Sequence, residues 1–109
     1  MARNIANFLE GRKGEDILVL DIKNIASFTD YFVIVSGTSK RMLQSLASAL
    51  SREIRTKFHK SSHPEGEADG GWIVLDYGDV VVHVFSPEQR EYYRLEDLWS
   101  EGNIVLRLM

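Results

Sequence analysis

The sequence predicts a mixed α/β or α+β fold, in which helices pack on a sheet in two or three layers. Three observations predict this class. Residues 71–85 read as two strands joined by a tight turn. Residues 40–58 place apolar side chains at helical spacing, and two short apolar runs rich in β-branched residues precede them. The chain has 109 residues, no repeat and no low-complexity segment, so residues 1–109 are expected to form one domain.

The first part of the chain carries one helix pattern and two strand patterns. Apolar residues at i, i+3 and i+4 predict a short amphipathic helix over residues 3–11. Residues 17–22 and 31–36 are apolar runs that predict strands, and residues 23–30 form a loop between them. The second run is apolar almost throughout, which indicates burial on both faces of a sheet.

A capped helix is expected after the second strand. Gly37 and Thr38 break the strand, and the Ser39 side chain can accept a hydrogen bond from a free backbone N–H. The helix then runs over residues 40–58, with its apolar stripe on the sheet and a basic cluster on its other face. The polar segment 59–71 is predicted to be a long connection, of a kind that is often mobile or functional.

The hairpin at residues 71–85 is the central element of the predicted sheet. Its arms are rich in Val and Ile, which suit a half-buried pleated surface. The cluster Asp76-Tyr77-Gly78-Asp79 supplies turn chemistry, because Gly accepts a positive φ and Asp tolerates left-handed geometry. The turn is therefore expected at the edge of the molecule.

The last part of the chain begins with a helix start. Ser86 can cap, Pro87 suits the first turn, and Gln89 completes a capping box. Helical structure is expected over residues 87–101, either continuous or broken in two. The segment 103–109 fits either an extra edge strand or a docked tail, and the sequence leaves both open.

Composition excludes several classes of protein. The chain has no cysteine, which excludes disulfides, thiol catalysis and cysteine-held metals and suits a reducing cytoplasm. No apolar run approaches the roughly 20 residues that span a bilayer, and the first residues do not resemble a secretory signal. A cytoplasmic protein without a membrane partner is expected. Thirteen basic and sixteen acidic residues give a net charge of −3, whereas a stand-alone nucleic-acid binder is more often basic.

A metal or phosphoryl-transfer site has only weak candidates. His59, His63 and Glu65 are the one metal-like cluster, but Pro64 argues against a helix that would align them, so solvated histidines are favoured. Gly37-Thr38-Ser39 could cradle a phosphate or begin a nucleotidyltransferase site, yet no Walker loop is present. Ser39 as a simple helix cap is the favoured interpretation.

The carboxylates and histidine of the hairpin do not form a recognisable catalytic pattern. Asp76 and Asp79 are the nearest candidates for a magnesium pair, but they flank a turn and need not point at one ion. His83 could be drawn into a triad with Ser39 and Asp76, although the spacing does not support it and no nucleophile elbow is present. A hydrogen-bonded structural histidine is the favoured interpretation. We expect no catalytic residue, cofactor or metal.

The hairpin residues favour a contact with a partner protein. Trp and Tyr are enriched at binding hot spots, and Trp72 and Tyr77 lie at the start and in the turn of the hairpin. Trp72 could equally seal the core, but the turn position of Tyr77 favours an interface over core packing. Carboxylates suited to Arg or Lys of a partner surround them. The predicted partner-binding residues are Trp72, Asp76, Tyr77, Asp79 and Glu65.

The ordered motifs resemble the ribosomal silencing factor family, also called RsfS or Iojap. The resemblance covers nearly the whole chain. It comprises DILVLDI at 16–22, TDYFVIVSGTS at 29–39, Glu65-Gly66, WIVLDYGDVVVHVF at 72–85, and the Arg90, Tyr93, Leu95, Glu96, Leu98 and Trp99 positions of REYYRLEDLW. The resemblance implies a nucleotidyltransferase-like fold that has lost its catalytic carboxylates, and therefore a protein that is not an enzyme.

The same resemblance implies a function and its partners. Family members are expected to bind the large ribosomal subunit through ribosomal protein fourteen, block association with the small subunit and repress translation; organelle relatives act in large-subunit assembly. The free form is expected to form a homodimer, and nucleic acid is met at most through neighbouring ribosomal RNA. The tail NIVLRLM is expected to extend beyond the point where many members end.

Two other functions stay open at this point. A nucleotidyltransferase-like enzyme would turn over a nucleoside triphosphate with magnesium and lose this activity on Asp76→Asn. A direct RNA binder would use the basic helix 40–58, with a steep salt dependence and a loss on Arg52→Glu with Arg55→Glu.

Overall fold

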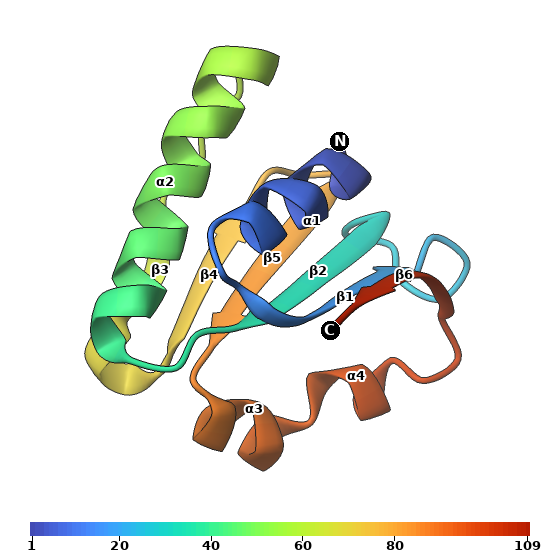
Figure 1. The fold of residues 1–109 in the computed structure, drawn as a ribbon. Coiled ribbons are helices and arrows are strands. Elements are labelled where there is room, and N and C mark those ends of the chain that lie inside the picture. Colours follow the sequence, from blue (N-terminus) through green and yellow to red (C-terminus); the bar gives the residue numbers. More distant parts are fainter.

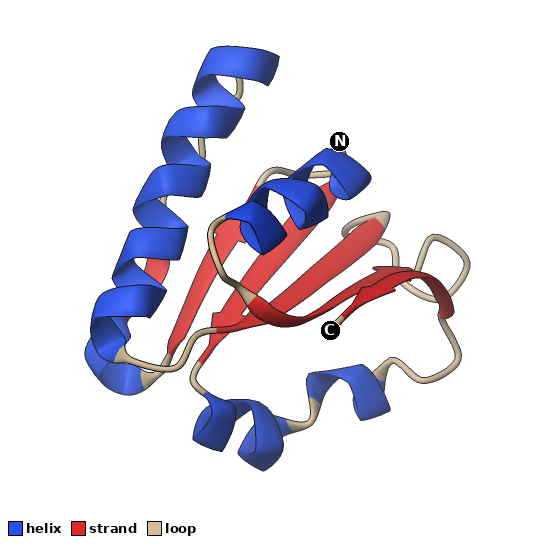
Figure 2. Cartoon of the chain, in the orientation of Figure 1, coloured by secondary structure: helices blue, strands red, loops and turns tan.

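The computed structural model describes residues 1–109 as one mixed sheet with helices on both of its faces (Figures 1 and 2). In chain order the elements are α1 (Ala2–Gly11), β1 (Glu15–Asp21), β2 (Tyr31–Ser36), α2 (Lys40–Phe58), β3 (Glu65–Glu67), a short 3₁₀ turn (Ala68–Gly70), β4 (Trp72–Asp76), β5 (Val80–Phe85), α3 (Pro87–Tyr93), α4 (Leu95–Leu98) and β6 (Asn103–Leu108). This confirms the mixed α+β class, whereas its nucleotidyltransferase-like form stays a prediction.

The sheet has six strands in the order β3-β4-β5-β2-β1-β6. Only β2 and β5 run parallel, and they pair from Tyr31 opposite Val80 to Ser36 opposite Phe85. The other neighbours are antiparallel. The interior strands β2 and β5 are buried almost throughout, as the apolar runs predicted, because helices cover both of their faces.

The two faces of the sheet have separate cores. On one face, α1 and α2 pack on the sheet around a core of 19 buried residues that includes Ile5, Leu9, Leu46 and Leu50. On the other face, α3 and α4 cover a smaller core of 8 buried residues, to which they contribute Leu95. The second face is therefore incompletely covered, and Figure 1 shows α3 and α4 lying along only part of the sheet.

The helix α2 has the predicted bounds, 40–58, and the predicted cap. The Ser39 hydroxyl accepts a hydrogen bond of 3.1 Å from the backbone N–H of Met42. The helix ends where His59 adopts the left-handed conformation, with φ of 56°. A continuous helix through His63 is thus excluded.

The connection predicted over 59–71 contains more structure than expected. Glu65–Glu67 forms β3, a three-residue edge strand paired with β4. All three residues are exposed and none has strong β propensity, so periodicity gives no strand signal. Backbone pairing with the exposed edge of β4 forms this strand.

In the last part of the chain, the structure decides two questions that the sequence leaves open: whether the helix over 87–101 is continuous, and whether the segment 103–109 is a strand. The predicted helix over 87–101 is broken in two by Arg94, whose φ is 47°, and it ends at Leu98. The segment after Gly102 is an edge strand, because β6 pairs antiparallel with β1. No helix has the length and apolar character to cross a membrane.

Candidate partner-binding surface

The hairpin turn is rigidly built from backbone and carboxylate hydrogen bonds. The N–H of Tyr77 donates to the carbonyl of Val80 at 2.9 Å, and the N–H of Gly78 donates to Oδ1 of Asp76 at 2.8 Å. Gly78 has φ of 89°, a conformation that glycine adopts without strain. The carbonyl of Asp79 accepts from two N–H groups at the start of β2, each at 3.1 Å. The tip is therefore anchored to the sheet.

The two carboxylates of the turn lie in different environments. Oδ1 of Asp79 forms an ion pair with Nζ of Lys60 at 3.4 Å, and both side chains are about half exposed, so solvent screens the pair. Asp76 is exposed and has no ion pair. Asp76 is thus the carboxylate of the turn that is most available to a basic partner.

The expectation that Tyr77 avoids the core is wrong. Its side chain is 7% exposed and belongs to the core beneath α1 and α2. The reason is the alternation of β4, which directs Ile73, Leu75 and then Tyr77 to the same face of the sheet. The phenol oxygen is buried and has no hydrogen-bond partner.

The alternate residues of β4 form the partly open face of the sheet, on the side of α3 and α4. Trp72, Val74 and Asp76 point away from α2, toward the side of α3 and α4. Glu65 is paired directly with Val74, so its side chain lies on this same face. The structure therefore brings together Trp72, Asp76 and Glu65, places Asp79 at the adjoining tip, and directs Tyr77 to the other side.

Trp72 and His83 form the polar contact in the middle of this face. The indole Nε1–H donates to Nδ1 of His83 at 3.2 Å. Burial lowers the pKa of His83 to about 4, and the negative charge of Asp76 opposes that shift. His83 faces away from the neighbouring valines and is hydrogen-bonded, as predicted. Its Nδ1 is occupied by Trp72 and its Nε2 has no partner, so the triad drawn with Ser39 and Asp76 is not formed.

Aromatic rings extend the face on both sides of Trp72. The Trp72 ring lies 4.7 Å from that of Tyr93 and 4.9 Å from that of Phe85. His83 lies 4.7 Å from Phe32, which contacts Phe28 and Trp99. The exposed large apolar side chains at or beside this face are Phe28, Tyr92, Tyr93 and Leu98.

Sequence reasoning did not assign Phe28, Tyr92 or Tyr93 to a binding surface. Phe28 lies in the predicted loop 23–30, and Tyr92 and Tyr93 lie in the predicted helix 87–101, where neither pattern indicates a binding surface. A signal was present in the sequence, because two adjacent tyrosines on a helix cannot both face one core.

The metal candidates are not assembled. No group of three or more His, Asp or Glu side chains could hold an ion. His59 caps the end of α2, and Glu65 lies on β3.

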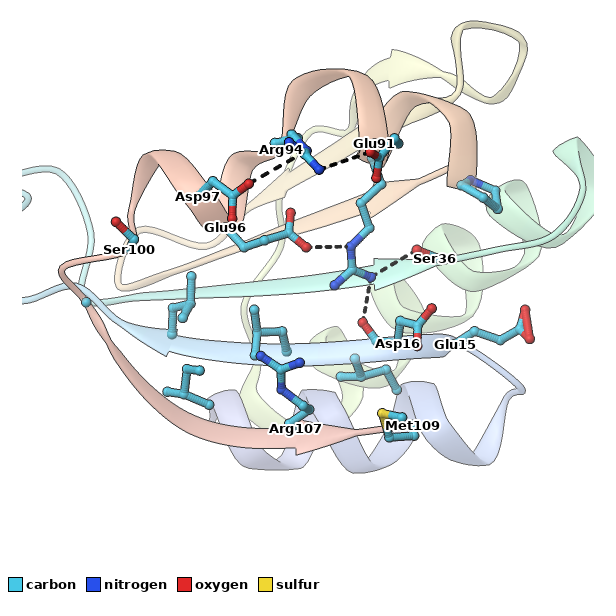
Figure 3. A pocket seen from close by; sticks show the side chains of 17 residues that line it. Glu15, Asp16, Ser36, Glu91, Arg94, Glu96, Asp97, Ser100, Arg107 and Met109 are labelled. Carbon is cyan, nitrogen blue, oxygen red and sulfur yellow. Dashed lines mark hydrogen bonds and ion pairs between the residues drawn. The ribbon is translucent and has the colours of Figure 1, made fainter.

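A second feature of this side is a cavity of about 660 Å³ between α3, α4 and the β1–β6 edge (Figure 3). Arg90 crosses it. Its Nε donates to Glu96 at 2.9 Å, and its Nη1 donates to the hydroxyl of Ser36 at 2.9 Å and to the carbonyl of Asp16 at 2.5 Å. Arg90 therefore ties α3 and α4 to β1 and β2.

The fold and the surface together define a class of protein: a small α+β domain with a mixed six-stranded sheet, one face of which is partly open, aromatic and acidic. Its sequence matches the model of the family described as "Ribosomal silencing factor during starvation" over residues 1–107. The chain belongs to the ribosomal silencing factor family.

Individual relatives agree with this assignment. The chain is 34% identical to the ribosomal silencing factor RsfS of Halalkalibacterium halodurans, over 91% of this chain and 85% of that protein. It is 33% identical to the mouse protein named mitochondrial assembly of ribosomal large subunit protein 1, over 88% of this chain and 43% of that protein. A crystal structure of a Chromobacterium violaceum protein superposes with a TM-score of 0.82 at 30% identity, covering 97% of this chain and 93% of that one.

The match corrects one expectation about the tail. The family pattern continues to residue 107 and so includes most of β6. Residues 103–107 of the tail are therefore part of the family pattern.

Proposed function

We propose that this protein silences the large ribosomal subunit by occupying it, without catalysing a reaction. It binds ribosomal protein fourteen and blocks association with the small subunit, which represses translation. Membership of the ribosomal silencing factor family supports the role. The observation that carries the mode of binding is the partly open face, where Trp72 packs against the exposed ring of Tyr93 and shares its strand with the exposed carboxylate of Asp76, which has no ion pair.

The chemistry of this face suits a basic partner surface. Aromatic side chains supply large and stiff contact area, and carboxylates accept hydrogen bonds from Arg or Lys. Trp72, Asp76 and Glu65 supply the contacts from the face and Asp79 from the tip. Tyr77 supports the hairpin from beneath, since its side chain is buried. The domain then acts by steric exclusion.

A second role, in assembly of the large subunit, is favoured by the name of the mouse relative. The two roles share the partner and differ in timing. Subunit joining in mature ribosomes tests silencing, and accumulation of large-subunit precursors in a deletion strain tests assembly.

The decisive experiment is co-sedimentation with purified large subunits. Asp76→Lys should abolish binding, and Asp76→Asn, which keeps the acceptor for Gly78, should weaken it. Glu10→Lys is the matched control, because Glu10 is exposed on α1, on the other face of the sheet. Undiminished binding by Asp76→Lys would remove this face from the interface. Intact ribosomes forming normally in an excess of the wild-type protein would contradict silencing.

A further inference from the structure

A groove runs along α2 on the face of the molecule opposite to the proposed partner surface. It encloses about 320 Å³ between the helix and the chain that returns from Phe58 to β3. Figure 1 shows this returning segment descending beside α2. The ten residues that line the groove are Gln44, Ala47, Ser48, Ser51, Arg52, Arg55, Ser62, Pro64, Gly66 and Ile73.

The walls of the groove are cationic and carry no carboxylate, although the chain has more acids than bases. The pairing of β3 explains this: Gly66 lines the groove, while Glu65 and Glu67 pair with Val74 and Trp72, which point to the other face of the sheet. The acidic strand therefore presents only a glycine to the groove. This separation leaves the positive potential of the helix uncompensated inside the groove.

The arginines of the groove are free to bind. Three lysines on or near α2 are paired: Lys40 with Asp69, Lys57 with Glu53 and Lys60 with Asp79. Arg52 and Arg55 are exposed and have no carboxylate within 4.0 Å. They are three residues apart and so lie on one side of the helix.

Hydroxyl groups line the same groove. Gln44 and Ser48 continue the line of the two arginines toward the start of the helix, at intervals of four residues. The Oγ atoms of Ser51 and Ser62 are enclosed and have no hydrogen-bond partner. Because both atoms are enclosed, each hydroxyl can donate to a phosphate oxygen only after its side chain rotates toward the groove.

We propose that this groove binds the phosphodiester backbone of a single RNA strand. A line of arginine and hydroxyl donors along a helix matches a row of phosphates, and arginine binds phosphate with a bidentate fork. The ribosomal family makes RNA the polyanion that the protein meets. The groove and the open face lie on opposite sides of the sheet, so one protein could contact RNA and a ribosomal protein at once.

The test is fluorescence anisotropy with a short unstructured RNA over a range of salt concentrations. Arg52→Glu with Arg55→Glu should weaken binding and reduce the slope of log K against log salt by about 1.4, since each phosphate contact on a single strand contributes about 0.7. Arg3→Glu with Lys13→Glu is the matched control, because both residues are exposed outside the groove and the net charge changes equally. The control should leave the slope unchanged.

Two further arms separate a built groove from general charge. Ser51→Ala with Ser62→Ala should weaken binding without changing the slope. Adenosine monophosphate should bind much more weakly than the RNA; equal affinity would overturn a strand as the ligand. The proposal would be overturned if Arg52→Glu with Arg55→Glu and Arg3→Glu with Lys13→Glu lost the same RNA affinity. It would also be overturned if the folded wild type did not bind RNA. The assay contains no ribosomal protein, so its failure would leave the proposed silencing function intact.

Discussion

The indole N–H of Trp72 and Nδ1 of His83 are joined by a hydrogen bond of 3.2 Å across β4 and β5. Because Nδ1 accepts this bond, the imidazole is neutral and carries its proton on Nε2. Phe32 packs against the histidine edge to face at 4.7 Å, and burial lowers the pKa of His83 to about 4. The contact therefore depends on a histidine that stays uncharged.

This contact predicts a pH dependence of stability. The unfolded chain takes up a proton on His83 below about pH 6.5, whereas the folded chain does so only near pH 4. The unfolded state thus binds more protons within that window, so stability falls as pH decreases from about 6.5 to about 4. The full difference corresponds to about 3 kcal/mol. Urea unfolding of the wild type and of His83→Gln at several pH values measures it.

The difference in pH dependence between the wild type and His83→Gln reports on this histidine alone, because the carboxylates are the same in both proteins. His83→Gln should lose less stability on acidification than the wild type. His63→Gln, which changes an exposed histidine, should behave as the wild type does. Parallel pH profiles for wild type and His83→Gln would show that this histidine is protonated equally in both states.

The buried phenol of Tyr77 predicts opposite effects for two substitutions. Tyr77→Phe removes a hydroxyl that has no partner and should leave the free energy of unfolding unchanged or raise it by about 1 kcal/mol. Tyr77→Ala empties a core position and should lower it by about 3–5 kcal/mol. Chemical denaturation of both variants measures these changes. A clear loss of stability in Tyr77→Phe would indicate that the hydroxyl has a bonding partner in solution.

Much of the fold could be predicted because its elements carry strong local signals. The cap at Ser39 and the apolar spacing predicted the bounds of α2, and turn residues between two apolar arms predicted β4 and β5. The short strand β3 could not be found, because three exposed residues pair only through their backbone. The break at Arg94 depends on one left-handed residue that is not glycine, which no local rule requires.

The candidate site was predicted only in part, for a similar reason. Trp72, Asp76 and Glu65 share a face, but their common side depends on the pairing of β3 with β4. Tyr77 was misplaced because a turn position suggested exposure, whereas strand alternation continued one residue beyond β4. The exposed ring of Phe28 joins the face only through tertiary contacts with Phe32 and Trp99.

Arg90 should be a major source of stability for the C-terminal helices. Arg90→Met removes three hydrogen bonds and leaves the partly buried carboxylate of Glu96 without its cation, which should cost about 3 kcal/mol. Arg90→Lys should recover only part of this loss, because one ammonium cannot reproduce the fork of donors. Urea unfolding, monitored by tryptophan fluorescence, gives the free energy of unfolding of both variants.

The matched control for this clamp is Arg94→Met. Arg94 pairs with Glu91 and Asp97 at the surface, where its side chain is 62% exposed, so its removal should change stability by no more than about 1 kcal/mol. Equal effects of Arg90→Met and Arg94→Met would mean that the contacts to Ser36 and Asp16 contribute little.

Gly66 should be a position where no side chain is accepted, because β3 lies against β4 there. Its φ is 84°, and a Cβ would lie 2.2 Å from the carbonyl oxygen of Trp72. Gly66→Ala must therefore displace β3 and should destabilise the protein by more than the roughly 1–3 kcal/mol that is typical of a strained backbone alone. Gly78→Ala is a sharp comparison, since Gly78 has φ of 89° but open space around it. If thermal unfolding showed the same loss for both, backbone conformation alone would explain the cost, and the close approach of β3 to β4 would not.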